Sequence, residues 1–178
     1  MKKQILAFFL VFTLLLTGCA NSSNKADLSD YDLLTVTDHN FITGNYEDIM
    51  TSLLAKEPGI YFFGYATCAW CRELVPELQE VVSEANLYVN YVDVSDRNNW
   101  TLALNNELTE FGSQFEEGAQ YEGVPYVIFV GDDGTLAAHV GTLPTHNAQQ
   151  RLMTDTERAY LQRVLRETIE SVGLSAQE

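Results

Sequence analysis

Two of the three cysteines in this 178-residue sequence, Cys68 and Cys71, stand three positions apart. Such a pair could form a structural disulfide, bind a metal ion, or exchange disulfides with another molecule. A disulfide across so short a loop would constrain the unfolded chain little, so stabilisation explains the pair poorly. A structural zinc site would need two more Cys or His ligands at short spacing, and His39, His139 and His146 are all distant. The pair therefore favours thiol–disulfide exchange, without a metal or cofactor.

The third cysteine, Cys19, ends a segment typical of a secretion signal. Two lysines precede an apolar stretch over residues 5–16, which is too short to span a bilayer as a stable helix. The segment closes with Leu16-Thr17-Gly18-Cys19, which resembles the bacterial lipobox, whose cysteine is lipidated and becomes the new N-terminus. The alternative is an ordinary signal peptide that happens to contain a cysteine. We expect residues 1–18 to be removed and lipid on Cys19 to anchor the protein to the extracytoplasmic face of the cell membrane.

Composition sets the domain organisation and excludes one class of partner. Residues 19–32 are rich in Asn, Ser, Lys, Ala and Asp, which predicts a lipidated, flexible tether. The apolar content of residues 33–178 suits a single domain. The chain has 25 acidic and 10 basic residues, a formal net charge of −15, and no basic patch. We therefore expect no nucleic-acid partner, and we expect the lipid rather than the acidic surface to hold the protein at the membrane.

The residues around the cysteine pair predict a strand, a tight turn and a helix. The apolar, aromatic run over 59–65 is typical of a buried strand, and residues 66–67 interrupt it. Apolar residues then recur at three- and four-residue steps from Leu74 to Ala85, which predicts a helix. Cys68 would begin this helix, where free backbone N–H groups favour a thiolate, and Cys71 would lie one turn inside it.

At this point the sequence resembles the thioredoxin superfamily. Cys68-Ala69-Trp70-Cys71 after a strand matches its redox motif, and Pro76 stands where the family carries a helix-kinking proline. Gly123-Val124-Pro125-Tyr126, before the apolar run 127–130, resembles the family's cis-proline loop. An ordinary trans proline at a strand start is the alternative for Pro125.

The resemblance implies an α/β thioredoxin-like fold, with a central mixed sheet flanked by helices. It also implies a thiol–disulfide oxidoreductase that acts on protein thiols or disulfides and is recycled by a redox partner. Val124 and Pro125 would then bind substrate backbone beside Cys68, and Trp70 is the aromatic residue that we expect to be exposed. Val124 is more similar to its counterpart in DsbA-type oxidases than in thioredoxins, but the direction of exchange stays open. The chain is also broadly similar to bacteriocin-transport accessory proteins.

The remaining elements can be placed on this fold, and the resemblance covers residues 33–172. A turn signal at 131–134 predicts a hairpin between two apolar runs. The expected elements are strands over 33–37, 87–94, 126–130 and 136–140, and helices over 46–56 and 155–172.

Two features depart from the family pattern. The 31 residues between Asp93 and Pro125 are more than the minimal connection requires, and a stripe of apolar residues there predicts an enlarged helical crossover. We interpret the stripe as core packing rather than a substrate groove; it comprises Trp100, Leu104, Leu108, Phe111 and Phe115.

The second departure concerns proton transfer. Thioredoxins usually carry a buried acidic residue six positions before the first cysteine, and here that position is Phe62. The proton acceptor for Cys71 is therefore water or a carboxylate that the sequence does not identify.

A binding module is the alternative function. A thioredoxin fold can also bind copper or a partner protein without catalysis, and copper-chaperone relatives pair two cysteines with a histidine late in the fold. His139 or His146 would be that ligand.

Overall fold

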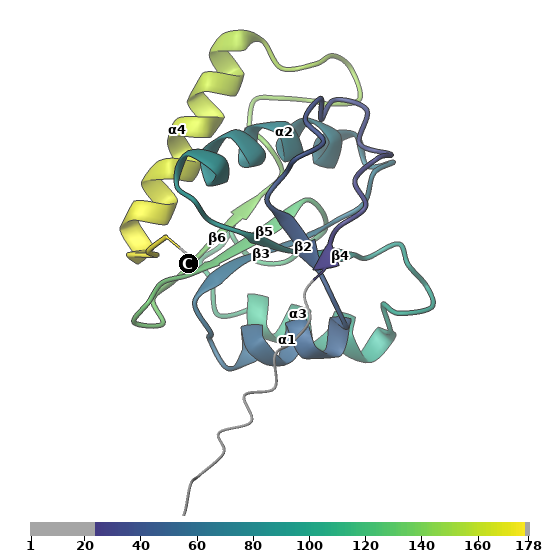
Figure 1. Ribbon diagram of the computed structural model, residues 1–178, viewed down its shortest axis with the longest axis vertical. Coiled ribbons are helices and arrows are strands. Elements are labelled where there is room, and N and C mark those ends of the chain that lie inside the picture. The colour runs from purple at the N-terminus through teal and green to yellow at the C-terminus, as the bar shows by residue number, and fades with distance from the viewer. Residues whose placement is uncertain (1–23, 177–178) are drawn as a thin grey trace, which may run out of the picture.

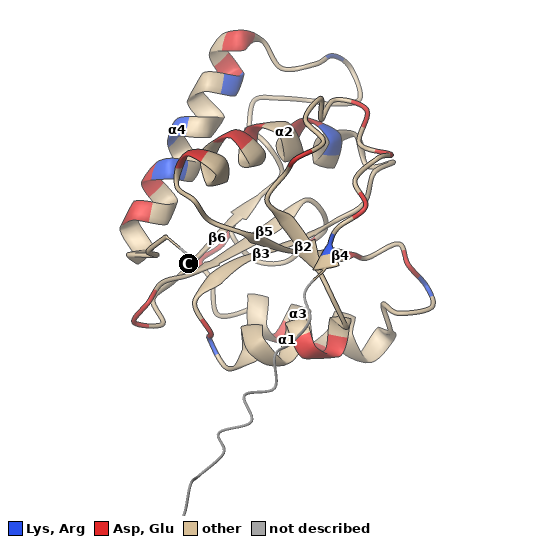
Figure 2. Cartoon of the chain, in the orientation of Figure 1, with Lys and Arg blue, Asp and Glu red and all other residues tan. Residues whose placement is uncertain are grey.

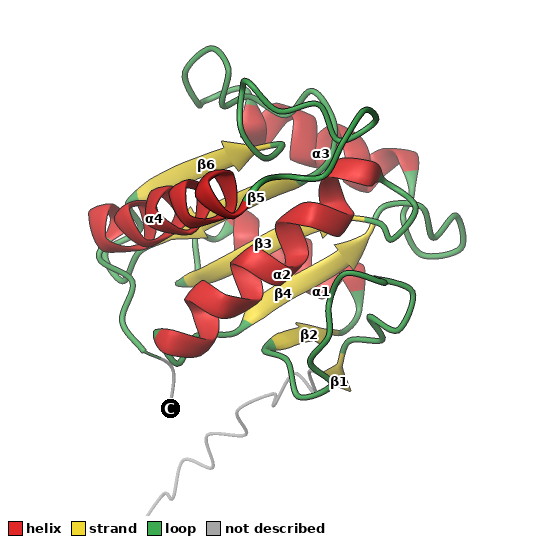
Figure 3. Ribbon diagram, turned by 90° about the horizontal axis from the view of Figure 1, so that it is seen from above, coloured by secondary structure: helices red, strands yellow, loops and turns green. Residues whose placement is uncertain are grey.

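The computed structural model describes residues 24–176, where six strands form one mixed sheet in the order β1-β2-β4-β3-β5-β6 (Figures 1 and 3). Strands β2, β4 and β3 run parallel, whereas β1, β5 and β6 are each antiparallel to a neighbour. The strands are β1 (Asn24–Lys25), β2 (Phe41–Thr43), β3 (Gly59–Gly64), β4 (Val89–Asp93), β5 (Tyr126–Val130) and β6 (Leu136–Val140).

The helices of the described residues cover both faces of this sheet, which makes the protein a three-layer α/β structure. Helices α1 and α3 pack together on one face, and α2 and α4 pack together on the other (Figure 1). Every residue of β3 is buried, because this central strand has neighbours on both edges and helices on both faces. The helices are α1 (Tyr46–Leu54), α2 (Ala69–Glu84), α3 (Leu102–Gly112) and α4 (Asp155–Val172).

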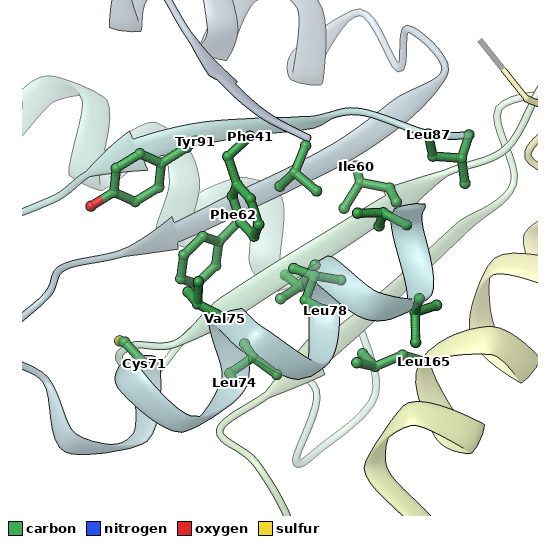
Figure 4. Packing of buried hydrophobic residues seen from close by; sticks show 14 of the residues in the cluster. Phe41, Ile60, Phe62, Cys71, Leu74, Val75, Leu78, Leu87, Tyr91 and Leu165 are labelled. Carbon is green, nitrogen blue, oxygen red and sulfur yellow. The ribbon is translucent and has the colours of Figure 1, made fainter. Parts of the chain in front are cut away.

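The sheet separates two hydrophobic clusters. Phe62 and Phe63 are neighbours in β3, so their side chains point to opposite faces. Phe62 belongs to the cluster under α2 and α4, which also contains Cys71 and Leu74 (Figure 4). Phe63 belongs to the cluster under α1 and α3. Each cluster is closed by the apolar faces of two helices, and Val124 packs against both clusters.

The topology brings Pro125 to the cysteine pair. Because β5 is antiparallel to β3, it begins beside the end of β3, with Tyr126 opposite Phe63. The residue before β5 therefore lies at the edge of the sheet where β3 ends and α2 begins. Two segments 54 residues apart in sequence thus meet at this edge, as the sequence predicts.

Most of the predicted elements are confirmed. The hairpin strands over 126–130 and 136–140 and the helix over 155–172 have the expected bounds. The strands around 59–65 and 87–94 are slightly shorter than expected. Helix α3 is the crossover helix, and Leu104, Leu108 and Phe111 are buried in the cluster under α1 and α3. The interpretation of this stripe as core packing is therefore confirmed for these three residues.

The predicted strand over 33–37 is wrong, because the first long-range parallel strand is β2 at Phe41–Thr43. Phe41 is completely buried, and the side chain of Asn40 donates a hydrogen bond to the Leu87 carbonyl at 2.9 Å. The chain then needs only two residues to reach α1, whereas a strand ending at residue 37 would need eight. The shorter connection matches ordinary β–α connections.

The predicted tether over 19–32 is also wrong where the structure describes it. Lys25 pairs with Ile42 in the sheet, and Ala26, Leu28 and Tyr31 are buried in the cluster that contains Cys71. Three apolar residues spaced among polar ones suffice to fix the segment, because each finds a place in an existing core. Cys19 and the expected signal peptide over 1–18 lie outside the described residues.

Acidic residues are spread over the chain (Figure 2), and most of the basic residues in the described range form ion pairs with them. On α4, Arg158, Arg163 and Arg166 lie within 4 Å of the carboxylates of Glu77, Glu167 and Glu84 respectively. Between residues 24 and 176, this pairing leaves α4 without the unneutralised basic face that a nucleic-acid backbone would need.

Candidate active site

Cys68 is the N-cap residue of α2, so its side chain lies where the first turn of the helix has unpaired N–H groups. Its Sγ accepts a hydrogen bond from the backbone N–H of Cys71 at 3.2 Å. Both cysteines are free thiols. The strand, turn and helix predicted around the pair thus place Cys68 at the helix start and Cys71 one turn inside.

The two cysteines differ in exposure. Cys68 is 8% exposed, whereas Cys71 is completely buried. Gly64, the last residue of β3, makes room for the inner thiol: a Cβ there would overlap the ring of Phe62 and lie 3.3 Å from the Sγ of Cys71. Sequence reasoning did not single out Gly64. A glycine that ends an apolar, aromatic strand is nevertheless a recognisable signal of close approach.

The surroundings shift the pKa values of the two thiols in opposite directions. The pKa of Cys68 is lowered to about 7, first by a hydrogen bond from the Cys71 thiol and then by the backbone N–H groups of Cys71 and Trp70, with partial burial opposing. The pKa of Cys71 is raised, first by burial and then by the hydrogen bond and negative charge of Cys68. Near neutral pH the arrangement therefore favours one thiolate, at Cys68, with the proton retained by Cys71.

Val124 and Pro125 lie beside the outer thiol. The Sγ of Cys68 donates a hydrogen bond to the carbonyl of Val124 at 3.6 Å. The Val124–Pro125 peptide bond is cis, as the resemblance to the thioredoxin superfamily implies. Four predicted site residues, Cys68, Cys71, Val124 and Pro125, are thus together at one edge of the sheet.

Trp70 is half-buried rather than fully exposed, which corrects the sequence expectation. It packs against the cluster that contains Cys71, because it lies in the first turn of α2, whose apolar side faces the sheet. Its contribution to the site is therefore partly to packing and partly, through its backbone N–H, to the low pKa of Cys68.

A groove lined by aromatic and aliphatic residues, and also by Thr101 and Asn105, adjoins Val124 on the α3 side of the site. Its volume is about 370 Å³. Trp100, whose ring centroid lies 5.8 Å from that of Phe63, contributes to both the core and the groove. The crossover segment thus helps to form this groove, although the buried part of its stripe is core. The principal lining residues are Tyr65, Val94, Trp100, Leu102, Tyr121 and Val124.

His139 and His146, the two candidate copper ligands, both lie within the packed structure. The Nε2 of His146 lies 2.9 Å from a carboxylate oxygen of Glu73, and both side chains are almost completely buried. The second oxygen of Glu73 accepts a hydrogen bond from the Met153 N–H, so this pair fixes the segment before α4 to α2. His139 lies in β6, and burial lowers its pKa. Across residues 24–176, no three His, Cys, Asp or Glu side chains are arranged to hold a metal ion.

The segment before β2 supplies a wall of the site that sequence reasoning missed. Arg72, next to Cys71, donates two hydrogen bonds to the carboxylate of Asp32, one of them at 2.7 Å. Tyr31 is 2% exposed and belongs to the cluster around Cys71. An aromatic residue followed by two leucines within a polar stretch was the available signal.

Comparison of the sequence with protein-family models gives no match. In the part of the chain that the structure describes, no helix has both the length and the apolar character needed to cross a bilayer.

Proposed function

We propose that this protein is a thiol–disulfide oxidoreductase of thioredoxin-like fold, with Cys68 as the nucleophile and Cys71 as the resolving thiol. One observation carries the proposal: Cys68, which is 8% exposed, caps the helix that completely buries Cys71 one turn away, and this position lowers the pKa of Cys68. A structural pair would gain nothing from this asymmetry. A disulfide-exchange reaction needs this difference, because one thiol must attack the substrate while the other stays protonated until the mixed disulfide has formed.

The reaction has two sulfur-transfer steps. The Cys68 thiolate attacks one sulfur of a substrate disulfide, and the other substrate sulfur leaves as a thiolate that takes a proton from solvent. Cys71 then loses its proton and attacks the Sγ of Cys68, which releases the second substrate thiol. The substrate gains two electrons and the cysteine pair loses two, so a redox partner must reduce the pair again. The same steps in reverse would oxidise a substrate dithiol.

The arrangement of elements supports the thioredoxin-like fold. Strands β2, β4, β3, β5 and β6, with helices on both faces, have the order and directions that the resemblance implies. Strand β1 is an addition to that set, and helix α3 forms the crossover between β4 and β5. Pro125 precedes β5 at the edge where α2 begins, which is the place of the family's cis-proline.

The Val124 backbone and the adjoining groove are the proposed substrate site. An extended substrate segment could pair with the backbone of Val124 as a short added strand, while a neighbouring side chain enters the groove between Trp100 and Tyr121. Each backbone hydrogen bond contributes about 1 kcal/mol net, so binding should be weak and selectivity broad. Proteins with accessible thiols or disulfides are therefore the proposed substrates.

Redox titration of residues 24–178 tests the proposed activity. We expect a single two-electron equilibrium with a glutathione or dithiothreitol buffer, and catalysis of protein disulfide exchange that disappears in a Cys68→Ser/Cys71→Ser variant. The measured potential also decides whether the protein acts as a reductant or an oxidant. A wild-type protein that exchanges disulfides no faster than free cysteine would contradict the proposal.

We also propose that lipid on Cys19 anchors the domain outside the cell membrane. Only residues 20–23 separate Cys19 from β1, so the folded domain would lie close to the lipid surface. Cys19→Ala should release the protein, because acyl chains contribute about 0.8 kcal/mol for each buried methylene. Fractionation measures the release. Recovery of a processed Cys19→Ala protein in the membrane fraction would disprove the anchor.

A further inference from the structure

The proposed function leaves Cys71 with a problem of proton transfer. This thiol is completely buried and its pKa is raised by that burial, yet it must lose a proton before it can attack Cys68. Phe62, where the related proteins carry a carboxylate, is completely buried and stacks on the ring of Tyr91, with centroids 5.5 Å apart. The proton must therefore leave through other groups.

Two tyrosine hydroxyls meet inside the same cluster. Tyr31 comes from the segment before β2 and Tyr91 from β4, and the two hydroxyl oxygens are 3.3 Å apart. Both residues are buried, at 2% and 6% exposure, and their rings meet edge to face with centroids 6.1 Å apart. The Tyr91 hydroxyl points toward the end of the sheet where Cys71 lies (Figure 4). The pair thus provides polar atoms within an otherwise apolar core.

Electrostatics couple these hydroxyls to the reacting thiol. The pKa of Tyr31 is raised, first by burial, then by Tyr91, and further by the negative charges of Cys71 and Asp93. The pKa of Tyr91 is raised by burial and by the charges of Asp93, Tyr46 and Cys71. Both hydroxyls therefore stay protonated at neutral pH. A neutral hydroxyl can accept one proton while it donates its own.

Asp93 provides a carboxylate at the end of this path. It pairs with Gly64 across β4 and β3, and side chains two positions apart in a strand share a face. The Asp93 side chain is therefore on the same face as Tyr91, next to the vacant side-chain position of Gly64 that the Sγ of Cys71 approaches. Asp93 is half-buried, and its Oδ1 accepts hydrogen bonds from the N–H and hydroxyl of Ser95. Its position at the strand end gives it access to solvent.

We propose that the Tyr31–Tyr91 hydroxyl pair, together with Asp93, transfers the proton of Cys71 to the edge of the sheet. The proton of Cys71 leaves by way of this hydroxyl pair, whose oxygens are 3.3 Å apart, and the Asp93 carboxylate, and it passes from there to water. The electron pair stays on the Sγ of Cys71 and forms the bond to Cys68. The other titratable groups facing Cys71 are Cys68, which is in the mixed disulfide at this stage, and Tyr65, whose pKa is raised by burial and by both cysteines.

The test separates the two sulfur steps in one experiment. Reduced protein is mixed with dithiobis(nitrobenzoate), which releases one coloured thiolate when Cys68 attacks and a second when Cys71 resolves the mixed disulfide. In Tyr31→Phe, Tyr91→Phe and Asp93→Asn, the first phase should keep its wild-type rate. The second phase should slow about tenfold or more at pH 7, and its pH profile should move to higher pH, where hydroxide can remove the proton.

Matched controls remove a hydroxyl or a carboxylate elsewhere. Tyr61→Phe deletes a buried hydroxyl on the opposite face of the sheet, where it donates to the Glu57 carbonyl at 2.9 Å. Asp96→Asn alters a carboxylate three residues beyond Asp93 that accepts from the Asn98 N–H. Both controls should keep the wild-type second phase and its pH profile.

Three outcomes are decisive. A wild-type second phase in folded Tyr31→Phe/Tyr91→Phe protein would overturn the proton route but leave the exchange activity standing. Lower stability with an unchanged pH profile would show that the tyrosines only pack, which also overturns it. Absence of the first phase in the wild-type protein would instead refute the proposed function itself.

Discussion

Cys71→Ser protein should accumulate covalent complexes with its substrates, whereas Cys68→Ser protein should accumulate none. The reason is the asymmetry of the site: Cys68 is partly exposed with a pKa lowered to about 7, while Cys71 is buried with a raised pKa. Without Cys71, the mixed disulfide on Cys68 has no internal thiol to resolve it. Turnover should fall to background in both variants, which is the largest effect on activity that we expect.

Non-reducing electrophoresis of membrane extracts from cells expressing each variant measures these complexes. The bands of the complexes should disappear when a reductant is added, and the Cys68→Ser/Cys71→Ser variant should form no such complexes. The serine hydroxyl can donate a hydrogen bond in place of the Cys71 thiol, and the backbone N–H groups of residues 70 and 71 remain, so the pKa of Cys68 should stay lowered in Cys71→Ser protein. Because the thiolate is the attacking form, trapping should be slower at pH 6 than at pH 8. Equal trapping by the two single variants would show that the roles are not divided.

Gly131→Ala should have the largest effect on stability. Gly131 follows β5, and a Cβ there would overlap the carbonyl oxygen of Val172 and lie 2.7 Å from its carbonyl carbon. The obstacle is backbone at the end of α4, so relief requires the helix to shift against α2 and the sheet. We expect the free energy of unfolding to fall by about 3 kcal/mol. Urea denaturation of the two proteins measures this difference.

Gly44→Ala is the matched control. No atom outside its chain neighbours lies within 4 Å of a Cβ built at Gly44, and its φ is not in the left-handed region. The free energy of unfolding should therefore change by no more than about 0.5 kcal/mol. A Gly131→Ala protein as stable as Gly44→Ala would show that the end of α4 can move freely, contrary to its packing in the structure.

Helix α2 and the hairpin of β5 and β6 could be predicted because the sequence signals for them are local. The apolar spacing from Leu74 to Ala85 requires a helical period, and the turn signal at 131–134 lies between two apolar runs of equal length. Cys68 at the helix start and Pro125 before β5 follow from the same local patterns. These residues of the candidate site could therefore be identified from the sequence.

The first strand could not be predicted in the same way. Leu33 to Thr37 has as much strand character as Phe41 to Thr43, and the choice depends on partners far away in sequence. Asn40 is fixed by the Leu87 carbonyl and by Gln79, which receives one hydrogen bond and returns another. Such contacts select a register only after α2 and β4 are in place, so no local pattern contains them.

The wall formed by Tyr31 was missed for a related reason. Polar composition over 19–32 indicates disorder on average, but three buried side chains at Ala26, Leu28 and Tyr31 outweigh that average. Their burial depends on contact with the cluster that contains Phe62 and Cys71, which other segments of the chain form. The composition of a segment does not reveal which surfaces other segments of the chain provide for it to pack against.

The placement of Phe62 and Phe63 on opposite faces has a consequence for how such a protein can change over generations. The sulfur chemistry depends on the face under α2, whereas the groove depends on Trp100 and Tyr121 on the face under α3. Substitutions on separate faces of a rigid sheet have nearly additive effects. Substitutions at Trp100 or Tyr121 should therefore alter the proposed recognition of substrates with little effect on the thiols. Tyr65 and Val124 are the exceptions, because they line the groove and also pack against the cluster that contains the cysteines.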